Sequence, residues 1–229
     1  MRVHWLQHAP FEGLGCLSEW FVSRGHELSY TRLYEETSLP KVESFDWLVV
    51  MGGPMGVSDS NKYPWLCLEV DLIKSTITNG KRILGVCLGA QLMASAMGAK
   101  ISRNEEKEIG WFQVNKEGNE NTAFTKDTPK TFDAFHWHGD TFDIPQGGEH
   151  LFSSAATLNQ GFCIGTSVLA LQFHLELGVG DATRIARACP DDLSPGTYIQ
   201  QPKEFLSKND LFANANNLMG RLLATLEKG

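Results

Sequence analysis

Cys87 is the residue of this chain whose surroundings most favour chemistry, because it lies between glycines in residues 85–89 (GVCLG). The branched apolar residues 83–86 are typical of a buried strand, and the small apolar residues 91–97 suit a packed helix. So tight a strand-to-helix turn strains its middle residue, and flanking glycines remove side-chain clashes. The helix N-terminus then favours a thiolate over a thiol. We therefore predict that Cys87 is a nucleophile rather than a small buried hydrophobic residue.

A thiolate nucleophile needs a general base, and the base needs a residue that fixes its tautomer. His174 directly follows the apolar run 168–173, so we expect it at the C-terminal end of a strand, where open α/β sheets place their sites. Glu176 is two residues further on, and on an extended backbone both side chains project from one face. The carboxylate can then contact one ring nitrogen while the other faces Cys87.

Two further histidines, His136 and His138, have the same spacing. Together with His174 and Glu176 they offer an alternative, a metal site. That set lacks a recognised ligand spacing and leaves the turn at Cys87 unexplained, so no metal and no cofactor are predicted. Structural roles are predicted for the other histidines, which lie near strand or helix starts: His4, His8, His26 and His150.

A glycine-rich segment, residues 52–56 (GGPMG), directly follows the apolar run 46–51. Loops after the C-termini of parallel strands line the ligand crevice of open α/β sheets. The glycines let the backbone approach a ligand, and its N–H groups can face a developing negative charge. A plain tight turn is the alternative. A phosphate loop is excluded because no Gly-Lys-Ser/Thr sequence follows.

Composition bounds the class of protein. An apolar share of 42% is typical of a globular domain. The net charge of −7 and the lack of a Lys/Arg cluster argue against a nucleic-acid partner. The cysteines form no Cys-x-x-Cys pair, which argues against disulfides or zinc and predicts reduced thiols in the cytoplasm. No signal peptide and no membrane-spanning stretch are recognised, so no membrane partner is expected.

Hydrophobic periodicity predicts an α/β fold. Strands are expected at residues 2–7, 27–33, 46–51 and 83–86, and helices at 14–23, 65–78 and 91–97. That alternation predicts a doubly wound, mainly parallel sheet flanked by helices, with a nucleophile elbow at Cys87. Residues 100–103 and 109–114 are also strand-like, and the closely spaced short strands at 150–155, 161–165 and 168–172 predict an antiparallel extension, and thus a mixed sheet. The charged residues 104–108 are expected to form a solvated turn, and residues 211–226 an outer helix.

Three blocks, residues 52–54 (GGP), 85–91 (GVCLGAQ) and 172–176 (QFHLE), resemble the motifs of class I glutamine amidotransferase domains in order and spacing. The resemblance covers roughly residues 43–180. Residues 135–145, with a His-Gly-Asp run, resemble the guanosine monophosphate synthetase-like branch of that family.

The length of the chain and the lack of a second predicted core favour a single class I glutamine amidotransferase-like domain over residues 1–229. Its motif core would span about 43–180, and residues 181–229 would form a C-terminal loop and helical tail. No acceptor domain is recognised after residue 180, so a separate acceptor or synthetase subunit is the implied partner, beside a small-molecule substrate.

The resemblance also implies a reaction. Cys87 would attack the side-chain amide carbon of glutamine and form a γ-glutamyl thioester, with release of ammonia. His174 would be the general base and acid, and Glu176 would orient it. Leu175 stands where the family usually has proline, which should alter loop stiffness more than chemistry.

The remaining site residues follow from the same resemblance. The backbone N–H groups of Gly53 and Leu88 would form the oxyanion hole. Gln91 would hold the amino-acid end of glutamine, and Gly139 and Asp140 would complete that pocket.

Two classes of function remain open. The first is an enzyme, either a free-standing amidotransferase with a Cys-His-Glu triad or a hydrolase of γ-glutamyl peptides. The second is a non-catalytic glutamine-binding or regulatory module. The intact set of Cys87, His174 and Glu176 favours the enzyme, because a site that no longer catalyses a reaction has no physical reason to keep a strained turn.

Overall fold

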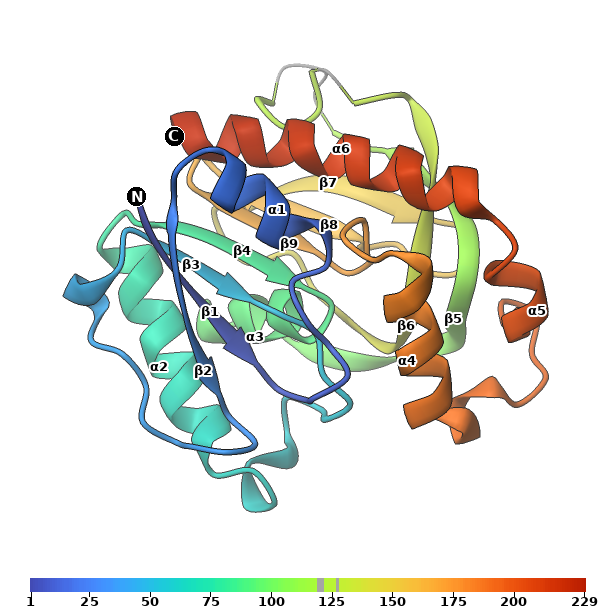
Figure 1. Cartoon of the computed structure of the whole chain (residues 1–229), viewed down its shortest axis with the longest axis horizontal. Helices are drawn as coiled ribbons and strands as arrows, with labels where there is room; N and C mark the ends of the chain where they lie inside the picture. The colour runs from blue at the N-terminus through green and yellow to red at the C-terminus, as the bar shows by residue number, and fades with distance from the viewer. Residues whose placement is uncertain (119–121, 127) are drawn as a thin grey trace.

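The computed structural model describes residues 1–118, 122–126 and 128–229 (Figure 1). Among these residues the strands form one sheet of nine, in the order β2-β1-β3-β4-β9-β8-β7-β5-β6. The strands are β1 Arg2–Gln7, β2 Glu27–Arg32, β3 Trp47–Val50, β4 Arg82–Val86, β5 Ile101–Lys116, β6 Thr131–Phe142, β7 Glu149–Ser154, β8 Gly161–Ile164 and β9 Val168–Leu171. From β2 to β9 neighbouring strands are parallel, and from β9 to β6 they are antiparallel. The predicted mixed sheet with an antiparallel extension is confirmed.

Helices cover both faces of the sheet. They are α1 Cys16–Ser23, α2 Trp65–Thr78, α3 Leu88–Ala96, α4 Val179–Ala188, α5 Pro202–Phe205 and α6 Asn209–Lys228, with short 3₁₀ turns η1 Val42–Ser44, η2 Asp59–Asn61 and η3 Pro190–Leu193. Apolar residues of α1, α4 and α6 pack in one core cluster, and those of α2 and α3 in the other. Figure 1 shows α6, in red, lying beside α1 over the sheet.

Strand β3 illustrates why a continuous apolar run is needed. Trp47 and Val49 belong to the cluster on one face, whereas Leu48 and Val50 belong to the cluster on the other, and all are fully buried. Side chains alternate along a strand, so a strand covered on both faces has no position for a polar residue.

The parallel strands bring the predicted site together. The segments that follow β1, β3, β4 and β9 carry His8, Gly52, Cys87 and His174, respectively. Because β1, β3, β4 and β9 are parallel neighbours, these carboxyl ends meet at one edge of the sheet.

The solvated turn predicted at residues 104–108 is wrong. Residues 101–116 form one strand, β5, whose pairing with β6 shifts between Arg103 and Glu108. Glu108 is fully buried, and donors distant in sequence form hydrogen bonds with its carboxylate, which makes that burial possible. Sequence reasoning also left β6 and α4 unassigned.

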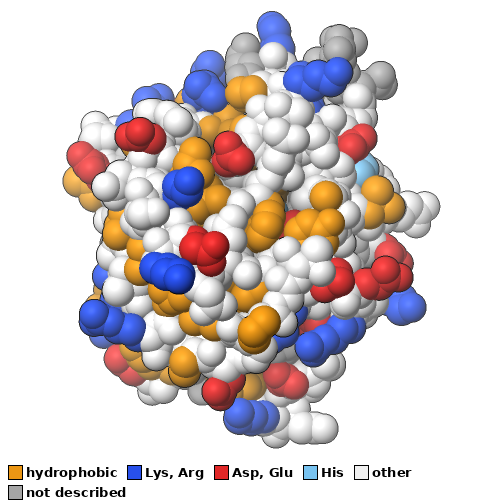
Figure 2. Space-filling model, turned by 90° about the vertical axis from the view of Figure 1, so that its right-hand side faces the viewer, with side chains coloured by type: hydrophobic (Ala, Val, Ile, Leu, Met, Phe, Trp, Pro, Cys, Tyr) orange, Lys and Arg blue, Asp and Glu red, His pale blue; other side chains and the backbone are white. Residues whose placement is uncertain are grey.

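The surface is mixed in charge. On the face shown in Figure 2, lysine and arginine side chains are interspersed with acidic ones and with small apolar patches. In the part of the chain that the structure describes, no helix has the length and hydropathy required to cross a bilayer.

Candidate active site

The turn at Cys87 has the strained geometry that its glycines predict. Cys87 has φ 52° and ψ −108°, and it is the one non-glycine residue with positive φ in the described ranges. Its N–H donates to the Leu171 carbonyl at 2.8 Å, which ties the turn to β9. A Cβ at Gly85 would lie 2.7 Å from the backbone of Gly89, and one at Gly89 would collide with the Val50 carbonyl. Only glycine fits either position.

The Cys87 side chain faces a cavity. The residue is 7% exposed, and its Sγ lies 3.6 Å from the Trp137 carbonyl oxygen. The cavity has a volume of about 350 Å³. Other predicted site residues line the same cavity: Gly53, Leu88, Gln91, Gly139, Asp140 and His174. Glu176 does not line it.

Glu176 lies behind His174. The Nδ1 atom of His174 is 2.7 Å from Oε1 of Glu176, and both residues are buried. Burial opposes a charge on the ring, but the Glu176 carboxylate and a hydrogen bond with Cys87 raise the pKa of His174 well above its ordinary value. The structure therefore brings all three predicted residues together, with Cys87 and His174 lining one cavity and Glu176 bonded to the His174 ring.

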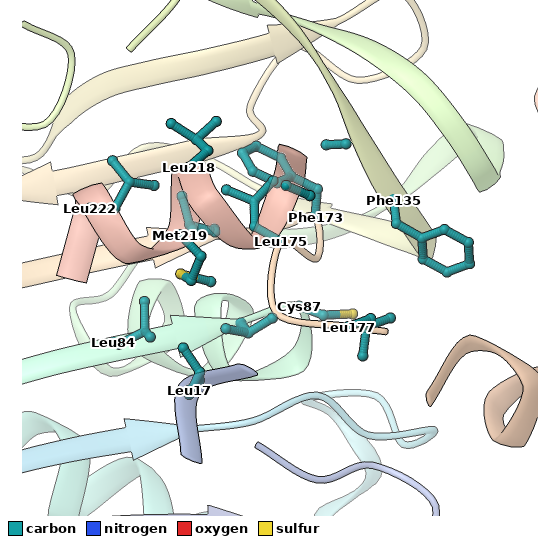
Figure 3. Packing of buried hydrophobic residues seen from close by; sticks show 14 of the residues in the cluster. Leu17, Leu84, Cys87, Phe135, Phe173, Leu175, Leu177, Leu218, Met219 and Leu222 are labelled. Atoms are coloured by element: carbon teal, nitrogen blue, oxygen red, sulfur yellow. The ribbon is translucent and has the colours of Figure 1, made fainter. Parts of the chain in front are cut away.

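The loop that carries His174 is fixed by backbone contacts. His174 N–H donates to the Phe135 carbonyl at 2.8 Å, and Phe135 N–H donates back at 3.3 Å. The Asn216 side chain donates to the carbonyls of Leu175 and Leu177 at 2.8 and 3.0 Å. Leu175, in place of the family's usual proline, is fully buried and lies in the cluster that includes α6 (Figure 3).

The two predicted oxyanion donors are neighbours. Leu88 is the first residue of α3, where backbone N–H groups have no partner within the helix. A Cβ at Gly53 would lie 2.9 Å from Cδ2 of Leu88 and 2.7 Å from Cβ of His8. The backbone of Gly53 therefore packs against the start of α3 as closely as any residue could.

Gln91 and Asp140 are linked. The Gln91 amide nitrogen donates to Oε1 of Gln172 at 3.2 Å and to the Asp140 carbonyl at 3.5 Å. A Cβ at Gly139 would lie 3.1 Å from Cγ of Lys107, so the β6 backbone lies close to the bulged part of β5 here. These residues form the wall of the cavity on the side of β6.

Sequence reasoning missed Glu108, which supports that wall from beneath. Its carboxylate accepts hydrogen bonds from Ser154 and Thr157 at 2.7 Å each and from Gln160 at 2.6 Å. Burial disfavours the charge, yet the His138 ring in contact with it, the nearby His136 and the hydroxyl donor lower the pKa of Glu108 to about 2.

The possible metal set differs from the one that the sequence suggested. Within the described ranges, Glu108, His136 and His138 place ligand atoms within 4.8 Å of one another. His174 and Glu176 are not part of this group. The Glu108 carboxylate already accepts from Ser154, Thr157 and Gln160, all neutral donors. The cluster is better suited to hold the two rings in place than to hold an ion.

Residues 16–187 match the family described as glutamine amidotransferase class-I. The chain is 31% identical over 184 residues to the glutamine amidotransferase-like protein YfeJ of Salmonella typhimurium, which covers 78% of this chain and 77% of that protein. The crystal structure of a glutamine amidotransferase from Thermotoga maritima has a TM-score of 0.89 and 31% identity, over 100% of this chain and 99% of the other. The chain belongs to the class I glutamine amidotransferase family, as its motifs predict.

A glutamine amidotransferase from Methylobacillus flagellatus also has this fold, with a TM-score of 0.92 at 25% identity over 99% of this chain and 94% of the other. The GMP synthase of Vibrio vulnificus is 33% identical over 105 residues, which are 44% of this chain but 18% of that enzyme. The resemblance to the guanosine monophosphate synthetase-like branch is thus confirmed, and this chain matches a small part of the full synthetase.

Proposed function

We propose that this protein hydrolyses the side-chain amide of glutamine through a γ-glutamyl thioester on Cys87 and releases ammonia. One observation carries the proposal. Cys87, on its strained turn, lines the same cavity as His174, whose Nδ1 atom is 2.7 Å from the Glu176 carboxylate.

The steps follow from this arrangement. The Cys87 thiolate attacks the amide carbon, and the Gly53 and Leu88 N–H groups stabilise the oxyanion that forms. His174 gives its proton to the amide nitrogen, which leaves as ammonia, and a thioester remains. His174 then takes a proton from water, which attacks the thioester and releases glutamate. Glu176 holds the ring in the orientation that both transfers need.

The substrate pocket and the partner are part of the same proposal. Gln91, Gly139 and Asp140 hold the amino-acid end of glutamine. A separate synthetase or acceptor subunit receives the ammonia, by analogy with the GMP synthases that the chain partly matches. The cysteines are free thiols, which supports a cytoplasmic location.

A second candidate, hydrolysis of γ-glutamyl peptides, is favoured by Arg103. Its exposed side chain lines the cavity, and the ion pairs formed by the described residues do not include it. Lys107, in contrast, is paired with Asp192 at 2.6 Å. The Arg103 guanidinium is therefore available to a carboxylate of a peptidic leaving group.

The experiment compares two products. The purified chain is incubated with glutamine and, separately, with γ-glutamyl dipeptides, and ammonia and free amino acid are measured. Ammonia from glutamine supports the first candidate. Preferential cleavage of dipeptides, lost in Arg103→Met, supports the second.

Cys87→Ser is the control for either reaction, because it should fold yet lose thioester trapping by a glutamine-mimicking electrophile. Binding of glutamine without turnover or trapping in the wild-type chain would contradict both candidates and leave a binding module.

A further inference from the structure

His8 and Glu69 form a buried pair that the proposed mechanism does not use. His8 follows β1 and Glu69 lies on α2, yet His8 Nε2 is 2.8 Å from Glu69 Oε1, and both side chains are 0% exposed. The other ring nitrogen, Nδ1, is 3.0 Å from the carbonyl oxygen of Gly52. The His8 ring also stacks on Trp65, with ring centroids 5.6 Å apart. The pair therefore connects α2 to the glycine-rich segment that lines the cavity.

The hydrogen bonds define the state of the ring. A carbonyl oxygen only accepts, so Nδ1 of His8 carries a proton, and the Glu69 carboxylate accepts from Nε2. Burial opposes the charge, but the Glu69 carboxylate and the Gly52 carbonyl raise the pKa of His8. The second carboxylate oxygen of Glu69 is buried without a hydrogen-bond partner among the described atoms, so its bond with His8 is what stabilises this buried carboxyl group.

The bond to Gly52 determines where the next N–H points. The Gly52 carbonyl and the Gly53 N–H belong to one peptide plane, and in a trans peptide they point in opposite directions. A carbonyl held by His8 therefore directs the Gly53 N–H away from His8. Gly53 itself lines the cavity and packs against Leu88.

We propose that His8, held by Glu69, is a positioning residue that keeps the Gly52–Gly53 peptide turned with its N–H toward the oxyanion. The oxyanion hole of this chain is then preformed and needs no partner to orient it. Turning the peptide over would leave a buried Nδ1–H of His8 without an acceptor, which opposes the flip. This inference rests on the proposed function, in which Gly53 is an oxyanion donor.

Two matched variants isolate the bond to Gly52. Asparagine places its amide nitrogen near the position of Nδ1, whereas glutamine places its amide nitrogen near that of Nε2. Both are made in a Glu69→Gln background, so that no uncompensated carboxylate is buried, and they are compared with Glu69→Gln alone. His8→Asn keeps a donor for the Gly52 carbonyl, and His8→Gln removes it.

The expected result is a split between kcat and KM. His8→Gln should lower kcat by about 10²-fold, the lower end of what loss of one oxyanion donor costs, with little change in KM. His8→Asn should restore most of that loss. Equal losses in the two variants would mean that His8 only fills space, and no loss in either would mean that its bond to Gly52 is unimportant; both results overturn the proposal.

A second readout separates the oxyanion from the nucleophile. Alkylation of Cys87 by iodoacetamide builds no oxyanion, so its rate should be the same in both variants. Affinity for the γ-aldehyde analogue of glutamine, which forms a tetrahedral adduct, should fall about 10²-fold in His8→Gln alone. A parallel fall in the alkylation rate would show that His8 acts on Cys87 instead.

Crystal structures of the two variants test the predicted orientation of the Gly52–Gly53 peptide directly, without a measurement of activity. The Gly52–Gly53 peptide should be turned over in His8→Gln and kept in His8→Asn. An unchanged peptide in both overturns the positioning role. If the wild-type chain hydrolyses neither glutamine nor γ-glutamyl dipeptides, the proposed function fails, whereas a turned peptide in His8→Gln alone would still support the positioning.

Discussion

The Nε2 atom of His138 lies 3.2 Å from Oε2 of Glu108, and this contact joins the cavity wall to the interior of the antiparallel extension. The other nitrogen of the His138 ring is 3.1 Å from the Asp140 carbonyl, which also accepts from Gln91. A carboxylate with no access to the cavity thereby holds the backbone that is proposed to bind the amino-acid end of the substrate.

We expect Glu108→Gln to weaken both folding and substrate binding. The glutamine side chain has an NH₂ group in place of one carboxylate oxygen. If that group faces Thr157 and Gln160, donor meets donor, and the free energy of unfolding should fall by about 2–3 kcal/mol. KM should rise more than kcat falls, because His138 and Asp140 shift. Urea unfolding and steady-state kinetics measure the two effects. The exposed Glu106→Gln is the matched control, and a similar loss in it would exclude a specific role for Glu108.

The stability of the protein should fall in mild acid. Burial lowers the pKa of His136 to about 3 from its ordinary 6.5. Between these values the unfolded chain binds more protons than the folded one, so stability is lost as the pH falls below 6.5. Glu108, with its pKa of about 2, adds a loss as the pH falls below 4.5.

Urea unfolding at pH 7 and pH 4.5 measures this dependence. His136 alone should account for about 2–3 kcal/mol of the difference, since one pKa unit corresponds to about 1.4 kcal/mol. His136→Gln should reduce the difference by that amount. If the stability difference between pH 7 and pH 4.5 is the same in the variant and the wild type, His136 takes up its proton without loss of stability, and the prediction is wrong.

The strained backbone at Cys87 should make glycine more stabilising there than alanine. A residue with a Cβ in this conformation costs about 1–3 kcal/mol, and glycine is relieved of that cost. The free energy of unfolding of Cys87→Gly should therefore be about 1–2 kcal/mol larger than that of Cys87→Ala, and both variants should be inactive.

In an ordinary helix the order is reversed. At a buried position of α3, Ala94→Gly should lower the free energy of unfolding by about 1 kcal/mol or more relative to the wild type. The prediction is contradicted if Cys87→Gly is the less stable member of the pair, as Ala94→Gly is relative to the wild type.

Gly53→Ala should inactivate the protein while leaving substrate binding largely intact. A methyl group there would lie 2.7 Å from Cβ of His8 and 2.9 Å from Cδ2 of Leu88, so the backbone must move. Loss of one oxyanion donor should lower kcat by about 10²–10³-fold. A Cβ at Gly13 meets no other atom within 4 Å, and Gly13→Ala should keep normal kinetics. A Gly53→Ala variant with wild-type kcat would remove Gly53 from the site.

The sequence predicts the residues whose signals are local. Cys87 is marked by its flanking glycines, and His174 with Glu176 by their place after an apolar run. The rule that sites lie beyond the carboxyl ends of parallel strands then brings these residues together without knowledge of the strand order. The predicted parallel sheet, its helices and its antiparallel extension follow from periodicity in the same way.

The supporting residues carry no such signal. The sequence predicts only a structural role for His8, because its partner Glu69 is 61 positions away. Glu108 lies in a charged run typical of a solvated turn, and its partners are 46 to 52 positions away. Such pairs depend on which strands and helices become neighbours, and local patterns do not encode that choice.

The pairing of β4 with β9 also sets the order in which the parts of the proposed site come together during synthesis. Gly85 pairs with Ala170, and Leu171 accepts the hydrogen bond from the Cys87 backbone, so the turn is completed by a segment made much later. A ribosome that has produced the sulfur-bearing half has not yet produced the imidazole. Nascent chains and fragments that stop before β9 should therefore lack the proposed reaction with glutamine, which becomes possible only when the domain closes around Cys87.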